Sequence, residues 1–168
     1  HWNFEKTKKE TQDIWEKELS KILIESKSEK QKEIFYTALY HSFIAPNIYT
    51  DVDGNYNGTD FKKHYTNDNH YTIFSLWDTF RATHPLFTLI QQEKTNEFIR
   101  TFLRQYKQGG KLPIWELAAN YTGCMIGYHA IPVIVDAYVK GLREFDVDLA
   151  LKAMINSANK DHLGLNWY

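Results

Sequence analysis

The sequence predicts an all-α domain built from helical hairpins, and three observations support that prediction. Apolar residues recur at helical spacing through most of the 168 residues. Strand signals are weak, and residues 131–139, "IPVIVDAYV", have a strand-like composition but continue the helical period. The predicted helices are joined by connections that alternate between short and long. Such an array can form a bundle, a solenoid or part of an α/α toroid.

Two helices are expected in the first part of the chain. The first covers about residues 5–24, where apolar side chains recur among charged ones. A polar stretch follows, and the second helix covers about residues 29–45. Ser28 can cap this helix, with Gln31 at its third position. Pro46 then ends it.

A long loop and four further helices are expected after Pro46. The loop, residues 46–70, is dense in Asn, Asp, Gly and Thr, and long ordered loops are disproportionately functional. The helices are expected at about residues 72–92, 94–107, 122–141 and 146–158. The His84-Pro85 dipeptide predicts a kink or boundary in the first of these four. A second loop, residues 109–120, separates the middle two.

Composition and charge exclude some functional classes. The chain has 20 basic and 21 acidic residues, and this balance gives no electrostatic footprint for nucleic acid. No apolar run approaches the roughly 20 residues that span a bilayer. The single cysteine, Cys124, excludes an intrachain disulfide. Because the chain starts with His1 rather than Met, we expect it to begin after processing or partway through a longer protein.

The 46–70 loop contains half of a calcium-binding pattern. Asp53, Asn55 and Asn57 supply oxygen at the first, third and fifth positions, and Gly58 follows at the sixth. The twelfth position, where a bidentate Glu is needed, holds His64. Asn and Asp also populate turns for local reasons. We therefore expect no metal ligand in this loop, and the histidines show no zinc-binding spacing elsewhere.

Charged residues interrupt several of the apolar segments. They are Asp78, Arg81, Glu116 and Asp136. Burying a charge costs several kcal/mol unless it is paired or bound to a ligand. Asp78 and Arg81 lie three residues apart on one helical face, so a structural ion pair is one interpretation. The other is that Trp77 and Asp78 open on a sugar pocket, with the indole as a platform and the carboxylate as an acceptor for hydroxyls.

Three strings in the sequence resemble glycoside hydrolase family 92, the calcium-dependent exo-acting α-mannosidases of Bacteroides and its relatives. They are "FYTALYHSFIAPNIYTDVDGNYNG", "YTIFSLWDTFRATHPL" and "LPIWELAANYTGCMIGYHAIPVIVDAYVKG". The resemblance runs from about Phe35 to Gly141 and continues in "ALKAMINSA". These strings are long and unusual, so the resemblance is specific.

The resemblance implies a fold and a domain order. Family members have an N-terminal β-sandwich followed by an (α/α)6 barrel, and residues 1–168 resemble about the first half of that barrel. The β-sandwich and the C-terminal half of the barrel are not in this chain. The family's general acid, general base and calcium-binding strings are absent too, so they are expected downstream of Tyr168. We therefore expect no catalytic residue here, and we expect the rest of the polypeptide as a partner.

The resemblance also implies a function. The parent protein would be a secreted or periplasmic bacterial enzyme that removes terminal α-linked mannose, most simply α-1,2-linked, from glycans with inversion. In the family a Trp-Asp pair lies in the pocket for the terminal mannose, and Trp77 and Asp78 match that pair. Arg81 would pair with or orient Asp78, and Tyr121 would contact the leaving-group sugar. Calcium is the implied cofactor, with ligands outside this chain.

Two other classes of function remain open. The chain could be a non-catalytic helical module that binds carbohydrate or protein through its aromatic residues, which make up 15% of the sequence. It could also belong to another α/α-toroid enzyme that acts on carbohydrate, such as a lyase. The family's catalytic strings, read in the gene beyond Tyr168, would distinguish these from a mannosidase.

Overall fold

A computed structural model describes residues 2–160, in which helices predominate. The chain forms two compact units, His1–Ile44 and Ala45–Tyr168. Within the described residues, no helix combines the length and the apolar character needed to cross a membrane.

Two capped helices make up the first unit. They are α1 (Phe4–Leu19) and α2 (Glu29–Ser42), and both end a few residues earlier than the sequence predicts. The backbone N–H of Gln31 donates to the side chain of Ser28, which confirms the predicted N-cap. Leu39 is the one buried residue in these two helices, so this unit buries little apolar surface on its own.

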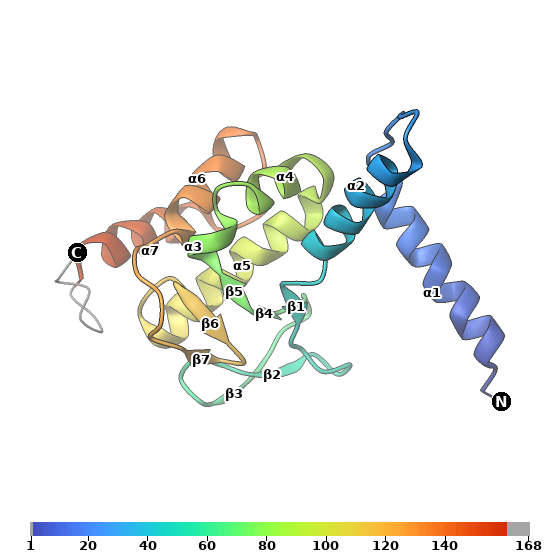
Figure 1. The fold of residues 1–168 in the computed structure, drawn as a ribbon. Helices are drawn as coiled ribbons and strands as arrows, with labels where there is room; N and C mark the ends of the chain where they lie inside the picture. Colours follow the sequence, from blue (N-terminus) through green and yellow to red (C-terminus); the bar gives the residue numbers. More distant parts are fainter. Residues whose placement is uncertain (1, 161–168) are drawn as a thin grey trace. The chain divides into compact units, whose positions relative to one another are not determined.

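The second unit is organised around one long helix, α5. Its helices are α3 (Leu76–Thr79), α4 (Thr83–Ile90), α5 (Gln92–Gly109), α6 (Ala130–Val139) and α7 (Val147–Asn159). Helix α5 contacts α4, α6 and α7, and Figure 1 shows it at the centre of the unit. Gly110 ends it in the left-handed conformation, with φ of 77°, which a residue without a Cβ adopts freely.

Aromatic side chains fill the core of the second unit. Phe74, Phe98 and Phe102 are each at most 2% exposed. The rings of Phe74 and Phe102 meet edge to face with centroids 4.8 Å apart, and Phe98 contacts Phe74 in the same manner at 5.9 Å. Such pairs add about 0.5–1.5 kcal/mol beyond the area they bury. Many of the aromatic residues are therefore core residues, as their size predicts.

Short strands lie in the connections between the helices. They are β1 (Asn47–Ile48), β2 (Asn55–Asn57), β3 (Lys63–Tyr65), β4 (Tyr71–Thr72), β5 (Phe74–Ser75), β6 (Trp115–Leu117) and β7 (Asn120–Tyr121). All pairings among them are antiparallel: β1 with β4, β2 with β3, and β6 between β5 and β7. The predicted loops, residues 46–70 and 109–120, thus contain strands. The pairing of these strands holds together segments that are far apart in the sequence.

The predicted helix over residues 72–92 is wrong in its first half. The chain there forms β4 and β5, then the single turn of α3, and only then α4. Backbone pairing with β6 takes precedence over the helical period of the apolar residues, because it satisfies the N–H and C=O groups of Phe74 and Ser75. The boundary lies before His84-Pro85 rather than at it, since Pro85 occupies the first turn of α4, where proline is tolerated.

The predicted helix over residues 122–141 is also shorter than expected. Helix α6 begins at Ala130, and residues 122–129 are irregular. Gly123 and Gly127 have φ of 67° and 84° in this segment, and a left-handed residue interrupts a right-handed helix. The helical fold class itself is confirmed, with strands added only in the connections.

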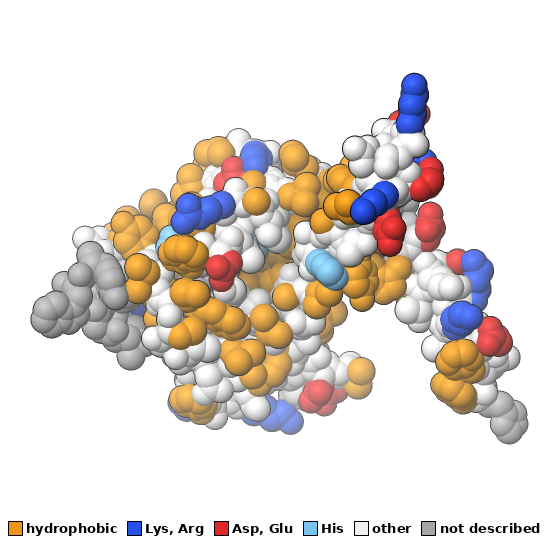
Figure 2. Space-filling model, viewed as in Figure 1, with side chains coloured by type: hydrophobic (Ala, Val, Ile, Leu, Met, Phe, Trp, Pro, Cys, Tyr) orange, Lys and Arg blue, Asp and Glu red, His pale blue; other side chains and the backbone are white. Residues whose placement is uncertain are grey.

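Apolar side chains remain exposed on several helices of the second unit. Leu89 on α4 and Val139 on α6 are each 67% exposed, and Leu151 and Ile155 on α7 are more than half exposed. Figure 2 shows apolar side chains among the charged ones on the face that carries α4 and α6. Surfaces of this kind favour association with another protein surface.

His84 makes the stability of the second unit depend on pH. Its side chain is 2% exposed and lies among Phe87, Phe98 and Phe102, with ring centroids about 6 Å away. Burial lowers the pKa of its imidazole to about 4. Between pH 6.5 and 4 the unfolded chain therefore takes up a proton that the folded chain does not, and stability falls as the pH falls.

We expect His84→Leu to remove this dependence. The wild-type free energy of unfolding should fall by about 1 kcal/mol per pH unit more than that of the variant between pH 6 and 4.5. Urea unfolding followed by circular dichroism at several pH values measures both slopes. Parallel slopes would show that His84 does not remain neutral in the folded chain.

Candidate functional site

Trp77 and Asp78 lie in the single turn of α3, directly after β5. The hydroxyl of Ser75 donates a hydrogen bond to the carboxylate of Asp78, which ties this side chain back to the end of the strand. Both Asp78 and Arg81 are exposed, and Trp77 is 37% exposed. The expectation that these charges are buried in an apolar helix is therefore wrong, and neither of them needs an ion pair for burial.

Arg81 contacts aromatic rings instead of Asp78. Its guanidinium carbon lies 5.2 Å from the ring centroid of Trp77 and 5.0 Å from that of Phe80. No ion pair joins Arg81 to Asp78, both of which the structure describes. Phe80 in turn packs against His129, with ring centroids 4.4 Å apart and the ring planes tilted by 36°. Burial, together with the nearby charge of Arg81, lowers the pKa of His129, so that the imidazole favours its neutral form.

The sheet β5–β6–β7 connects the Trp77–Asp78 turn to Tyr121. Ser75 on β5 pairs with Trp115 on β6, and Glu116 on β6 pairs with Tyr121 on β7. Trp77, Asp78 and Arg81 thus follow the edge strand β5. Tyr121 lies on β7, the other edge strand of the same small sheet.

Tyr121 borders a pocket of about 340 Å³. The wall also includes Phe61, Gln105, Glu116 and Asn120, and most of it is apolar. Trp77, Asp78 and Arg81 do not line this pocket, although the structure describes all three. The sheet therefore carries two separate surfaces, an exposed one at α3 and a concave one at Tyr121.

Glu116 is a buried carboxylate that holds the backbone next to this pocket. It is 2% exposed, and one of its oxygens accepts from the Thr72 hydroxyl at 3.0 Å and from the Ala119 N–H at 2.7 Å. Burial raises the pKa of Glu116, while these hydrogen bonds oppose that rise. The residue stands out in the sequence as a charge in an apolar run, and its role in the structure is to bind a turn.

That turn places two alanines in the left-handed conformation. Ala118 and Ala119 have φ of 49° and 65°, the geometry of a two-residue hairpin turn that normally requires Gly or Asn. The N–H of Ala118 donates to the Thr72 hydroxyl at 2.6 Å, and the N–H of Ala119 donates to Glu116. Side-chain hydrogen bonds thus stabilise a backbone shape that these residues disfavour.

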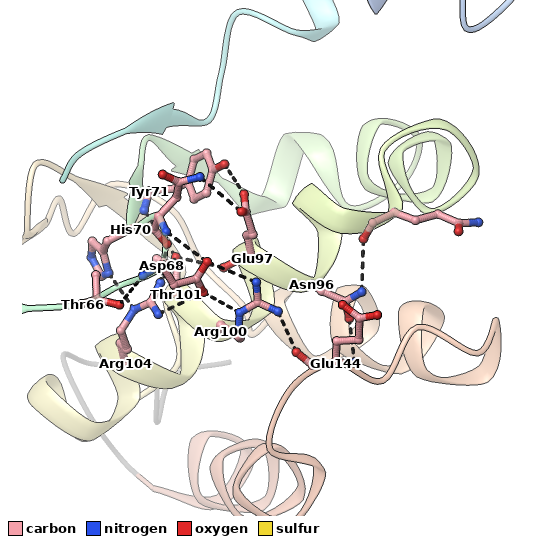
Figure 3. Close-up of polar contacts among 12 residues, drawn as sticks. Thr66, Asp68, His70, Tyr71, Asn96, Glu97, Arg100, Thr101, Arg104 and Glu144 are labelled. Carbon is pink, nitrogen blue, oxygen red and sulfur yellow. Dashed lines mark hydrogen bonds and ion pairs between the residues drawn. The ribbon is translucent and has the colours of Figure 1, made fainter. Parts of the chain in front are cut away.

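A polar cluster on α5 was not expected from the sequence (Figure 3). Asp68, Arg100 and Arg104 lie at its centre. Arg100 donates to Asp68 from Nε at 2.5 Å, and it also donates to the backbone carbonyl of Glu144 at 2.7 Å. Burial opposes ionisation of Asp68, but the hydrogen bond and charge of Arg100, aided by Arg104, hold its pKa below the usual value. Two arginines four residues apart on a helix that contributes to the core are the signal that could have revealed it.

Arg104 fixes the backbone that follows Asp68. Its guanidinium donates to the carbonyl of Asn69 at 2.6 Å, to the Thr101 hydroxyl at 3.0 Å and to Nδ1 of His70 at 3.2 Å. His70 is 1% exposed and stacks on Tyr56, with centroids 4.0 Å apart. Burial and the charge of Arg104 lower the pKa of His70 to about 3, so it accepts this hydrogen bond as a neutral ring.

Glu97 completes the cluster. It accepts from the Tyr71 hydroxyl and from the side-chain amide of Asn69. Burial and the neighbouring carboxylate raise the pKa of Tyr71, which stays a protonated donor. Side chains of α5 therefore hold every residue from Asp68 to Tyr71 (Figure 3).

The residues of the half calcium pattern do not converge on a metal site. Asn55 and Asn57 belong to strand β2, and the backbone and side-chain amides of Asn55 both donate to Asp53. His64 bonds to Asp60 instead of facing a metal position. Across residues 2–160, no group of three or more His, Cys, Asp or Glu side chains could hold a metal ion.

Comparison with known proteins assigns the chain to a family. The profile of the glycosyl hydrolase family 92 catalytic domain matches residues 1–167. The chain therefore belongs to glycosyl hydrolase family 92.

Solved structures of this family have the same fold. The GH92 α-mannosidase BT3965 of Bacteroides thetaiotaomicron is 39% identical, with a TM-score of 0.89 over 96% of this chain and 22% of its own. Its complex with mannoimidazole superposes with a TM-score of 0.88 at 40% identity. The inverting GH92 mannosidase BT2199 of the same organism is 32% identical, with a TM-score of 0.84 over 92% of this chain and 21% of its own. The prediction of a partial (α/α)6 toroid is confirmed.

A more distant relative is a secreted glycosidase of Arthroderma benhamiae. It is 27% identical over 161 residues, which are 94% of this chain and 17% of the relative. The chain thus spans about a fifth of the length of the relatives it matches. The roles predicted for Trp77, Asp78, Arg81 and Tyr121 remain predictions, and so does the location of the catalytic residues beyond Tyr168.

We expect Ala118→Gly to stabilise the second unit. Glycine adopts the left-handed conformation without the cost of roughly 1–2 kcal/mol that alanine bears there, and it loses about half of that gain through the more flexible unfolded chain. The net gain should be roughly 0.5–1 kcal/mol in urea unfolding. Ala158→Gly, at an α-helical position, is the control and should destabilise. Equal losses in both variants would contradict the strained turn.

Proposed function

We propose that this chain is part of an exo-α-mannosidase that removes terminal α-linked mannose from glycans. Membership of family 92 is the observation that carries this proposal, and the relatives named as α-mannosidases support it. An inverting mechanism follows the name of BT2199, and secretion follows that of the Arthroderma glycosidase. We further propose α-1,2-linked mannose as the substrate and calcium as the cofactor, with its ligands elsewhere in the polypeptide.

In this proposal Trp77 and Asp78 bind the terminal mannose. An ionised carboxylate accepts hydrogen bonds from two neighbouring hydroxyls, and the exposed indole offers an apolar face to the C–H groups of the ring. Both side chains are accessible at the turn after β5, as a sugar contact requires. Since Arg81 lies over the ring of Trp77, its role would be to orient the indole rather than the carboxylate.

Tyr121 and the pocket beside it would face the remainder of the glycan. The pocket volume of about 340 Å³ lies at the lower end of the range for small-molecule sites. Its aromatic wall members, Phe61 and Tyr121, suit a sugar ring. We propose that the leaving-group sugar contacts Tyr121.

The catalytic groups would come from the rest of the polypeptide. Inverting hydrolysis needs one carboxylic acid to protonate the leaving group and one carboxylate to activate water. Glu116 is too fully buried and too engaged with the 118–119 turn to serve as either. The exposed apolar faces of α4, α6 and α7 would then pack against the missing part of the toroid.

Replacement of Asp78 tests the sugar site. In the whole glycosidase that contains this chain, Asp78→Ala should weaken mannoimidazole binding at least tenfold, because a hydrogen bond to a charged group contributes about 1.5–3 kcal/mol. The melting temperature should hardly change, since Asp78 is exposed. Asp136→Ala, which removes a half-buried carboxylate paired with Lys140, is the control. Wild-type affinity in Asp78→Ala, measured by calorimetry, would exclude Asp78 as a sugar ligand.

The isolated 168-residue chain tests where catalysis lies. We expect it not to hydrolyse an aryl α-mannoside above background, with or without added calcium, because it should lack both catalytic carboxylates. Release of the aryl group, followed by absorbance, measures this. Calcium-dependent turnover by the purified chain would place the catalytic groups within these residues.

A further inference from the structure

Ile73 has a backbone conformation that its side chain disfavours. It lies between β4 and β5 with φ of 67°. The left-handed region costs an L-residue roughly 1–2 kcal/mol, and a β-branched residue there is a genuine outlier. Such a conformation persists only where the structure on both sides determines it. Ile73 lies four residues before Trp77, so its backbone conformation sets the direction in which the chain enters the proposed sugar site.

The chain after Ile73 is fixed by the core and by β6. Phe74 is 1% exposed and packs edge to face on Phe102. Phe74 and Ser75 pair with β6, and the N–H of Leu76 donates to the carbonyl of Ile114 at 3.3 Å. This side therefore cannot shift without disturbing the core.

The chain before Ile73 is fixed by polar side chains, and Arg104 is their centre. It donates to the carbonyl of Asn69, to His70 and to the hydroxyl of Thr101. The same hydroxyl accepts from the N–H of Tyr71 at 3.3 Å. The Arg104 guanidinium thus holds Asn69 and His70 directly, and it holds Tyr71 through the hydroxyl of Thr101 (Figure 3).

We propose that Arg104 is a positioning residue for the sugar site. It holds residues 69–71 against α5, and this attachment keeps Ile73 in the left-handed conformation that directs the chain into β5 and on to Trp77 and Asp78. Arg104 itself is partly buried in the cluster, and its influence on the site would pass through residues 69–71. What the site binds rests on the function proposed above, whereas the mechanical role of Arg104 does not.

The chemistry of the cluster requires arginine at this position. Guanidinium presents five N–H donors in a rigid plane, and Arg104 uses two of its nitrogens to reach Asn69, Thr101 and His70. A lysine ammonium has three donors on one atom and cannot span the same acceptors. Arg100, one turn away, shares Asp68 but donates to Glu144 and makes no hydrogen bond to residues 69–71. It is the matched control.

The experiment compares Arg104→Lys with Arg100→Lys in the whole glycosidase. Both variants keep the charge near Asp68. We expect Arg104→Lys to weaken mannoimidazole binding about tenfold or more, since small displacements of a positioned group have effects of this size. Arg100→Lys should change binding less than twofold. Amide hydrogen exchange of residues 71–79 should accelerate in Arg104→Lys and not in Arg100→Lys.

A second substitution separates positioning from general stability. Glycine adopts φ of 67° without cost, so Ile73→Gly should restore most of the lost affinity when it is added to Arg104→Lys. If Arg104 only stabilised the fold, Ile73→Gly would change binding by the same factor in the wild type and in Arg104→Lys, so the two substitutions would be additive. Should Arg104→Lys fail to fold, Thr101→Val takes its place, because it removes the oxygen shared by Arg104 and Tyr71.

The outcomes are distinct. Equal affinity and equal exchange in the Arg104 and Arg100 variants would overturn the proposal, as would a double variant no better than Arg104→Lys. If Asp78→Ala binds mannoimidazole as well as wild type, the proposed sugar-binding role of Asp78 fails. The exchange of residues 71–79 then still decides whether Arg104 positions this segment.

Discussion

The hydrogen bonds that Arg100 and Arg104 make with Asp68 and its neighbours are the interaction on which the rest of the second unit depends. Helix α5 has two faces with different chemistry. Its apolar face carries Phe98 and Phe102 into the core, where they meet the other helices and β5. Its polar face binds the end of the 46–70 segment through the arginines. One helix therefore fixes the loop and the core relative to each other within this unit.

This arrangement explains how short strands can be stable here. Strands of two or three residues bury little surface and would not persist alone. Strand β4 is anchored at both of its residues: Tyr71 by Thr101 and Glu97, and Thr72 by Glu116. Glu116 and Thr72 in turn hold the 118–119 turn, so side-chain hydrogen bonds connect the segment bound by α5 to the β6–β7 hairpin.

The sequence predicts those helices whose start and stop signals are local. Ser28 and Asp146 cap α2 and α7 where the sequence places helix starts, and Gly110 ends α5. The paired strands could not be predicted in this way. Phe74 pairs with a residue more than forty positions away, and its apolar neighbours fit a helical period equally well. The exposure of Asp78 and the contact of Arg81 with aromatic rings depend on that pairing, so the same reasoning expected buried charges instead.

The two-residue turn at Ala118–Ala119 couples the wall of the Tyr121 pocket to the interior of the second unit. The turn joins β6 to β7 beside that pocket, and Ala119 is 5% exposed. An insertion in this hairpin would separate the Ala119 N–H from the Glu116 carboxylate and leave a buried charge without that partner. The core therefore constrains the length of the hairpin, and this part of the pocket wall can vary more readily through the exposed side chain of Asn120.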